Sequence, residues 1–320
     1  MIERSVAVTA DLDGLRLDAA AAQLFDEFSR SRLQAWIGSG ALRLDGASAR
    51  QRDRVREGMR ITIEAYAEPE VSWERESLPL DLRFEDDHLL VLNKPAGTVV
   101  HPGAGNPSGT LVNALLDHRP GLANLPRAGI VHRLDKDTSG LLVVAGSELA
   151  HRSLVAQLQS KTVHREYFAI ARGYLSGGGR IDAPIGRHPR QRTRMAVLTK
   201  GGKEAVTHYR IAERFAHFTA LTVRLETGRT HQIRVHLAHR GYPLVGDPVY
   251  GGRFRRPPGA CEAFVATLQR FRRQALHARR LEFVHPARDE TLAFETDLPD
   301  DIKALLAELR RYDAPEHEAR

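Results

Sequence analysis

The chain has 320 residues, of which 42% are hydrophobic and 27% are charged, and Cys261 is its single cysteine. This length suffices for two compact domains, and without a run of 18 apolar residues no membrane span is predicted. One cysteine excludes an internal disulfide framework and a multi-cysteine metal site. Because no secretory signal follows Met1, we expect a cytoplasmic protein without membrane contact.

Charge is distributed unevenly along the chain, whose Lys and Arg residues exceed its Asp and Glu residues by 7. Residues 1–78 carry 11 basic and 14 acidic side chains, whereas residues 79–320 carry 36 and 26. Most of the basic residues are arginines, which suit phosphate recognition but are also typical of a GC-rich genome. The positive excess of the larger part indicates a polyanionic partner.

Two helices are predicted near the start of the chain. The alanine-rich run over residues 15–25 favours the first helix. Residues 32–37 predict a second helix, which Ser29 or Ser31 would cap and which Gly38 would end.

A strand hairpin is predicted next. Residues 41–44 and 58–63 alternate like strands, and Asp45-Gly46 is a typical hairpin turn. Between the strands, arginine occupies every second position of residues 50–56. Two helices and a hairpin are a frequent plan of nucleic-acid-binding modules, and the alternative is a small α/β lobe that packs on its neighbour.

The motifs of this segment resemble those of the S4 RNA-binding domain. They are Arg16-Leu-Asp, Ser29-Arg-Ser-Arg-Leu-Gln-x-Trp-Ile, Leu44-Asp-Gly and Gly58-Met-x-Ile. The resemblance implies an RNA-binding domain over residues 14–66, and the acidic, proline-containing residues 67–79 predict a linker. Phosphate contacts would come from the exposed-looking arginines of this domain: Arg30, Arg32, Arg52 and Arg54.

The sequence of residues 79–320 predicts a mixed sheet. Its apolar runs predict strands over residues 88–93, 141–145, 166–171, 205–211 and 218–225, and helix-like segments cover residues 149–160, 230–239 and 261–273. Because strands and helices do not alternate regularly, a doubly wound parallel sheet is not expected. We predict an α+β fold with a mixed, largely antiparallel sheet and flanking helices over residues 80–310. Residues 311–320 predict a polar, frayed tail.

Patterns of several other enzyme classes are incomplete. The glycines of residues 103–109 lack the spacing of a dinucleotide loop, and no phosphate loop of the nucleotide-hydrolysing enzymes occurs. His231, His236 and His239 share one short predicted helix, but no cysteine or carboxylate pattern completes a metal site. We therefore interpret them as structural or phosphate-facing, and we expect no metal.

Polar residues are densest directly before a predicted strand. Residues 132–137 hold four charges and a histidine, followed by an apolar run. A capped turn explains Asp137 and Thr138, but it explains neither Asp135 nor the neighbouring Arg133.

Two further stretches place polar groups beside buried positions. In residues 226–237, Thr230 is predicted to cap a helix, which sets Arg234 beside the buried stripe, where an arginine needs an anionic partner. Strand alternation places Tyr167 and Ala169 on one face, where the tyrosine either fills the core or serves a site.

Together these motifs resemble those of the RluA-type pseudouridine synthases. The matching runs are Asn93-Lys-Pro-x-Gly, Val100-His-Pro-Gly, His132-Arg-Leu-Asp-x-Asp-Thr-Ser-Gly and Gly228-Arg-Thr-His-Gln-Ile-Arg. Two flanking runs, Arg127-Ala-Gly-Ile-Val and Leu244-Val-Gly-Asp-Pro-Val-Tyr-Gly-Gly, resemble those of members that modify large-subunit ribosomal RNA.

The resemblance implies a role for four residues. Asp135 falls on the catalytic aspartate of the family, Tyr167 on its active-site tyrosine, and Arg234 on the arginine that pairs with the aspartate. Arg133 falls on the residue that supports the flipped nucleotide. The implied reaction breaks the N1–C1′ bond of uridine, turns the uracil and bonds C5 to C1′, which requires neither a cofactor nor a metal.

This chemistry is consistent with these residue types. An ionised carboxylate can act as a nucleophile or as a base, and a paired arginine keeps it ionised. A tyrosine can stack on uracil and move a proton. The residues leave three routes open: attack at C1′, attack at the base, and a glycal intermediate. The target uridine must leave its stack, and Arg133 can replace it there.

The resemblance also implies the partner. It is a 23S rRNA hairpin that faces the small subunit, or a large-subunit assembly intermediate, and we expect a monomer. Basic stretches 187–194 and 253–256 either hold the RNA or are solvated loops; the RNA contacts expected from the first are Arg187, Arg190 and Arg192. Two alternatives remain open: a synthase for another RNA, such as tRNA, and a non-catalytic RNA-binding assembly factor.

Overall fold

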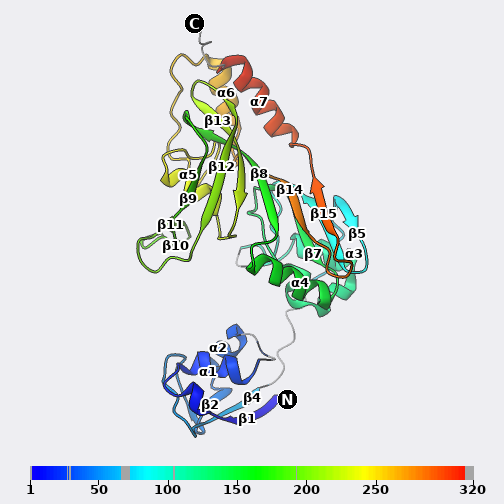
Figure 1. Ribbon diagram of the computed structural model, residues 1–320, viewed down its shortest axis with the longest axis vertical. Helices are drawn as coiled ribbons and strands as arrows, with labels where there is room; N and C mark the ends of the chain where they lie inside the picture. Colours follow the sequence, from blue (N-terminus) through cyan, green and yellow to red (C-terminus); the bar gives the residue numbers. More distant parts are fainter. Residues whose placement is uncertain are drawn as a thin grey trace. The chain divides into compact units, whose positions relative to one another are not determined.

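The computed structural model describes residues 2–26, 28, 30–65, 73–103, 105–191 and 193–313. The chain divides into two compact units, Met1–Ser72 and Trp73–Arg320. Each unit has a hydrophobic core of its own. The N-terminal unit is drawn in blue in Figure 1.

The N-terminal unit contains two helices and a four-stranded sheet of order β1-β4-β2-β3. Its elements are β1 (Ile2–Ala7), α1 (Leu17–Leu24), α2 (Arg30–Ser39), β2 (Leu42–Leu44), β3 (Ala47–Ser48) and β4 (Arg60–Ala65). The two predicted helices and the strands predicted at residues 41–44 and 58–63 are confirmed, but the Asp45-Gly46 turn leads into β3, which was not predicted. Strand β1 was not predicted, and its pairing with β4 extends the unit to the start of the chain. The predicted helix cap falls on Ser29 and on the side chain of Ser31, which lie outside the described residues.

A buried carboxylate ties the two helices of this unit together. Asp18 on α1 accepts hydrogen bonds from Arg16, Arg30 and Gln34 at 2.8 to 3.3 Å. Burial by itself raises the pKa of Asp18, but these three partners outweigh burial and lower the pKa to about 2.

This shift predicts an acid-sensitive N-terminal unit. The folded-state pKa of Asp18 lies below its ordinary value of 3.8, so its contribution is present above about pH 4 and is lost as the pH falls toward 2. We expect a loss of about 2 kcal/mol in the free energy of unfolding over this range. Urea unfolding followed by Trp36 emission, with Trp73 replaced by phenylalanine, measures it. Asp18→Asn should remove this pH dependence, and an unchanged pH profile in that variant would contradict the assignment.

The C-terminal unit is built on a nine-stranded sheet of order β5-β6-β7-β14-β8-β13-β12-β9, with β15 paired to β14. The strands are β5 (Leu82–Glu85), β6 (Leu89–Lys94), β7 (Ser139–Ala145), β8 (His164–Arg172), β9 (Gly179–Asp182), β12 (Val206–Arg214), β13 (Phe218–Leu225), β14 (Leu276–Val284) and β15 (Thr291–Glu295). Strands β7 and β14 are parallel and all the other pairs are antiparallel. The predicted α+β fold with a mixed, largely antiparallel sheet is confirmed.

Helices flank this sheet, with α6 and α7 near one end of the unit and α3 and α4 near the other (Figure 1). They are α3 (Leu111–His118), α4 (Glu148–Gln159), α5 (Gln232–His239), α6 (Glu262–Arg270) and α7 (Asp300–Tyr312). A separate two-stranded hairpin, β10 (Ile185–Arg187) and β11 (Met195–Val197), carries the basic loop. In the described part of the chain, no helix has both the length and the apolar character needed to cross a membrane.

The central strands are buried on both faces, which explains their continuous apolar sequences. In β6, Leu90 and Leu92 belong to one core cluster, whereas Leu89 and Val91 belong to another. Every residue of β7 is buried. The polar loop before β7 is therefore anchored at one end by a strand that is buried on both faces.

The boundary between the units differs from the predicted linker. Residues 66–72 lie outside the described part, but residues 73–79 are attached to the C-terminal unit. The Asn113 side chain donates to the Glu74 carbonyl at 2.7 Å, and the Glu76 carboxylate accepts from the Gly109 amide at 2.8 Å. These hydrogen bonds to α3 and the loop before it hold a segment whose composition is typical of a linker.

The C-terminal boundary also differs from the prediction, because α7 continues to Tyr312. The apolar face of this helix packs into the core, and Asp313 is 4% exposed. The Asp313 carboxylate accepts hydrogen bonds from the backbone and the ring of His217, both at 2.7 Å. Residues 311–313 are therefore part of the folded unit, and residues 314–320 lie outside the described part.

Candidate active site

A cleft of about 980 Å³ opens in the C-terminal unit. The loop before β7, strand β8 and the start of α5 line it. Among the lining residues are Arg133, Asp135, Tyr167 and Arg234, the four residues to which the sequence analysis assigned the chemistry. A cleft of this size is typical of a small-molecule or nucleotide pocket.

Asp135 and Arg234 form an ion pair at the bottom of this cleft. Arg234 Nη1 donates to Asp135 Oδ2 at 2.9 Å, across 99 residues of sequence. The Asp135 side chain is 16% exposed and that of Arg234 is 5% exposed. The carboxylate therefore keeps access to the cleft, while the guanidinium lies in the core.

Asp247 holds the other edge of the same guanidinium. Arg234 Nε and Nη2 donate to the two Asp247 carboxylate oxygens at 2.7 and 3.0 Å. Burial by itself raises the pKa of Asp247, but the bonds from Arg234 outweigh burial and lower it. Burial likewise favours a lower pKa for Arg234, and its two carboxylate partners raise it. Arg234 and Asp247 are therefore both ionised, and Arg234 is fixed in a planar, bidentate geometry.

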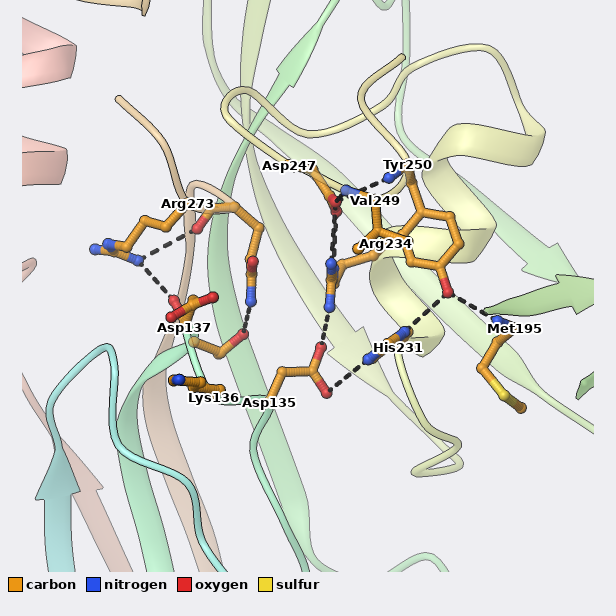
Figure 2. A network of polar contacts seen from close by, with 12 residues as sticks. Asp135, Lys136, Asp137, Met195, His231, Arg234, Asp247, Val249, Tyr250 and Arg273 are labelled. Carbon is orange, nitrogen blue, oxygen red and sulfur yellow. Dashed lines mark hydrogen bonds and ion pairs between the residues drawn. The ribbon is translucent and has the colours of Figure 1, made fainter. Parts of the chain in front are cut away.

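His231 approaches the second oxygen of Asp135. Figure 2 shows a chain of contacts from Met195 through Tyr250 and His231 to this carboxylate. The Tyr250 hydroxyl accepts from the Met195 amide at 2.9 Å and lies 2.8 Å from His231 Nδ1. Burial lowers the pKa of His231, so the ring is neutral. With Nδ1 as acceptor, the proton is on Nε2, 3.9 Å from Asp135 Oδ1.

The start of α5 differs from the prediction that Thr230 caps the helix. His231 occupies the cap position with φ +57°, and its side chain makes no capping bond. A left-handed backbone is uncommon for a histidine. Because His231 makes no capping bond, the helix does not explain this conformation. The contacts of its ring with Tyr250 and Asp135 do.

Lys94 holds the loop that carries Asp135. Its ammonium group is fully buried and donates to the carbonyls of Pro95, Thr98 and Lys136 at 2.8 to 2.9 Å. Burial lowers the pKa of Lys94 to about 7, against the opposing effect of nearby carboxylates, chiefly Asp137. One side chain therefore joins the loop after β6 to the residue next to Asp135.

Tyr167 lies on β8 and lines the cleft, with 6% of its surface exposed. Burial raises the pKa of its phenol; Arg165 opposes this and Asp135 adds to it. The phenol is therefore protonated at neutral pH and lies in the field of both groups.

The predicted RNA-binding arginines lie in both units. In the N-terminal unit, Arg30 pairs with Asp18, Arg54 donates to the Gly14 carbonyl, and Arg32 lies over the Trp36 ring. Arg52 is exposed and lines a shallow hollow of about 560 Å³. In the C-terminal unit the exposed arginines of the β10–β11 hairpin are Arg187 and Arg190; Arg192 lies outside the described residues.

Metal ligation finds no support among the described residues, where no three His, Cys, Asp or Glu side chains are placed to hold an ion. His236 is fully buried between the Thr207 hydroxyl and the Ala183 carbonyl. This agrees with a structural role for that histidine.

No sequence pattern predicted a role for Asp247, Tyr250 or Arg165. A signal for Asp247 existed, since a buried arginine has five donors and one carboxylate cannot satisfy them. Tyr250 has no such signal, because its contacts join segments that are distant in sequence.

Comparisons with known proteins agree with this geometry. Residues 88–239 match the family described as RNA pseudouridylate synthase. Ribosomal large subunit pseudouridine synthase D of Pseudomonas aeruginosa is 57% identical over 97% of both chains, and that of Escherichia coli O6:H1 is 49% identical over 99% of this chain and 97% of the relative.

Two solved human structures share the fold. RNA Pseudouridylate Synthase Domain Containing 4 is 25% identical with a TM-score of 0.55, covering 72% of this chain and 92% of its own. Domain Containing 1 is 24% identical with a TM-score of 0.56, covering 75% and 98%. The chain therefore belongs to the RNA pseudouridylate synthase family and is an enzyme that isomerises uridine in RNA.

Proposed function

We propose that this enzyme makes pseudouridine in the large-subunit ribosomal RNA of a bacterium, 23S rRNA, with Asp135 as the catalytic residue. The observation that carries the assignment of Asp135 is its 2.9 Å ion pair with buried Arg234 inside the cleft. The substrate rests on the relatives named large subunit pseudouridine synthase D, which this chain matches along nearly its whole length.

Arg234 holds the Asp135 carboxylate in place through this ion pair. In the reaction the N1–C1′ bond of uridine breaks, C5 bonds to C1′, the hydrogen leaves C5, and N1 gains a proton. The carboxylate serves either as a nucleophile or as a base at the sugar or the ring. Because Asp247 fixes the guanidinium, Asp135 Oδ2 has one preferred position, and Oδ1 lies 3.9 Å from His231 Nε2.

Tyr167 and Arg133 hold the flipped nucleotide. Tyr167 lines the cleft with a protonated phenol, which suits stacking on uracil and donation of a proton or hydrogen bond to the ring. Arg133 is exposed at the cleft two residues before Asp135. Its guanidinium is placed to fill the gap that the extruded uridine leaves in the RNA stack.

The surrounding RNA is held by basic surfaces. The N-terminal unit serves as an S4-type RNA-binding domain, while the β10–β11 arginines contact phosphates. The contacts of the N-terminal unit are Arg30, Arg32, Arg52 and Arg54, of which Arg30, Arg52 and Arg54 are exposed. The enzyme works as a monomer in the cytoplasm, without a cofactor, and its partner is 23S rRNA or an assembly intermediate.

Loss of one hairpin arginine should weaken RNA binding without slowing the chemistry. For Arg190→Gln we expect a weaker affinity for 23S rRNA fragments and a slope of log affinity against log salt that is smaller by about 0.7 to 0.9. Filter binding at several salt concentrations measures both. Arg152→Gln, at an exposed position of α4, is the matched control. An unchanged slope for Arg190→Gln would remove this residue from the interface.

Pseudouridine mapping tests the substrate. Ribosomal RNA is mapped from a strain that lacks the gene and carries either the wild-type enzyme or Asp135→Ala. Pseudouridine restored in a 23S hairpin facing the small subunit by the wild type alone supports the proposal. Marks that depend on the wild type but lie in tRNA or another rRNA site would identify a different substrate.

A further inference from the structure

Arg165 is a second buried arginine of the cleft. It lies on β8 two residues before Tyr167, so strand alternation places both side chains on the same face. Both line the cleft, and Arg165 is 8% exposed.

Among the residues that the structure describes, Arg165 has no anionic partner. Arg234, which is 4% exposed, makes three hydrogen bonds to two carboxylates. Within the described ranges, by contrast, no carboxylate lies within ion-pair distance of Arg165, and its buried Nε lacks any hydrogen-bond partner. A buried charge without a counter-charge costs several kcal/mol, so a protein keeps one where a ligand supplies the counter-charge.

The neighbouring His132 does not act as a partner of Arg165. Burial lowers the pKa of His132 to about 3, and the positive charge of Arg165 adds to this decrease. The neutral His132 ring instead accepts the Val143 amide hydrogen at 3.1 Å.

Gly228 lies against the Arg165 guanidinium. A Cβ on Gly228 would lie 2.7 Å from Arg165 Nη1, so a side chain at this position would displace the end of the arginine side chain. The backbone of Gly228 is outside the left-handed region, and this glycine opens the same motif that ends with Arg234.

We propose that Arg165 binds an anionic oxygen of the target nucleotide in the cleft. The inference rests on the proposed function, and two oxygens of that nucleotide fit. One belongs to its phosphodiester, which is anionic throughout. The other is a uracil carbonyl oxygen, because breakage of the N1–C1′ bond sends the electron pair into the ring, where N1 and the carbonyl oxygens share the charge until C5 bonds to C1′.

Turnover and binding distinguish the two oxygens. Single-turnover rates and dissociation constants are measured on a 23S rRNA transcript for wild type, Arg165→Met and Arg165→Lys. Contact with the uracil oxygen predicts a rate about 10²- to 10³-fold lower for Arg165→Met at saturating RNA, with unchanged affinity. Contact with the phosphate predicts about tenfold weaker binding and a smaller salt slope, with an unchanged rate at saturation. Arg165→Lys keeps the charge and should recover part of either loss.

Thermal unfolding of the free enzyme provides a readout that does not depend on turnover. Arg165→Met removes an unpaired buried charge, so its Tm should equal or exceed that of the wild type. Arg234→Met removes an equally buried arginine but leaves the buried Asp247 carboxylate without its partner, so the Tm of this variant should fall. A lower Tm for Arg165→Met would show that the arginine is a structural partner and would overturn the proposal.

Pseudouridine formation by the wild type distinguishes a failure of this inference from a failure of the proposed function. If the wild type makes no pseudouridine in the 23S transcript, the substrate assignment fails first. If it does, and Arg165→Met matches its rate and affinity within twofold, Arg165 binds no substrate oxygen.

Discussion

Asp135→Asn is expected to abolish pseudouridine formation while leaving the fold and RNA binding intact. The substitution keeps the size of the side chain but removes its charge, and with it the nucleophile or base. Loss of such a residue lowers turnover by about 10⁴-fold or more. Arg234 stays fixed, because Asp247 still accepts two of its hydrogen bonds.

Release of tritium from RNA that carries [5-³H]uridine measures this turnover, because the reaction removes the hydrogen from C5. Asp117→Asn, at an exposed position of α3, is the control for the same chemical change elsewhere. Turnover by Asp135→Asn within 100-fold of the wild type would assign the chemistry to another group. Loss of RNA binding by this variant would instead indicate that the carboxylate shapes the binding surface.

Asp247→Asn is expected to lower both stability and activity. The Asp247 side chain is fully buried and faces a guanidinium that is 5% exposed. Removal of one partner of a buried pair lowers the free energy of unfolding by about 3 to 5 kcal/mol. The freed guanidinium also positions Asp135 less well, and small misplacements of this kind lower rates by about 10²-fold.

Urea unfolding followed by Trp73 emission, with Trp36 replaced by phenylalanine, reports on the C-terminal unit. Asparagine keeps an oxygen for the Val249 and Tyr250 amides, which donate to Asp247 Oδ1, so the variant isolates the effect of charge. Glu262→Gln breaks an exposed ion pair with Arg256 and should change stability little. If both variants changed the free energy of unfolding equally, the buried pair of Arg234 and Asp247 would contribute no more to stability than an exposed ion pair.

The sequence predicted the strands with continuous apolar runs and missed β14. Its sequence includes Arg279 and Arg280 in succession, and the register with β8 shifts between Ala278 and Arg280. This irregularity interrupts the alternation by which a half-buried strand is recognised. Strand β1 has polar residues at three of its six positions and no regular alternation, so its pairing with β4 decides its structure.

The residues of the candidate site that lie in sequence motifs were predictable from the sequence. The family resemblance pointed to Asp135 and Arg234, and the structure places them 2.9 Å apart. It did not point to Asp247: the five donors of a buried arginine indicate a second acceptor, but nothing local shows which carboxylate supplies it. The absence of a partner for Arg165 is a property of the whole fold, and a linear pattern cannot report it.

The position of β14 determines when the site exists during synthesis. Asp135 precedes β7, and Tyr167 and Arg234 belong to segments on the β8 side of the sheet. Strand β14 lies between β7 and β8 and pairs with both. A growing chain makes the catalytic side chains early but receives the strand that joins the two halves only at residues 276–284. A nascent chain that ends before residue 276 therefore carries the aspartate, the tyrosine and the arginine without the strand that joins the two halves of the sheet. It gains activity only once residues 276–284 have been made.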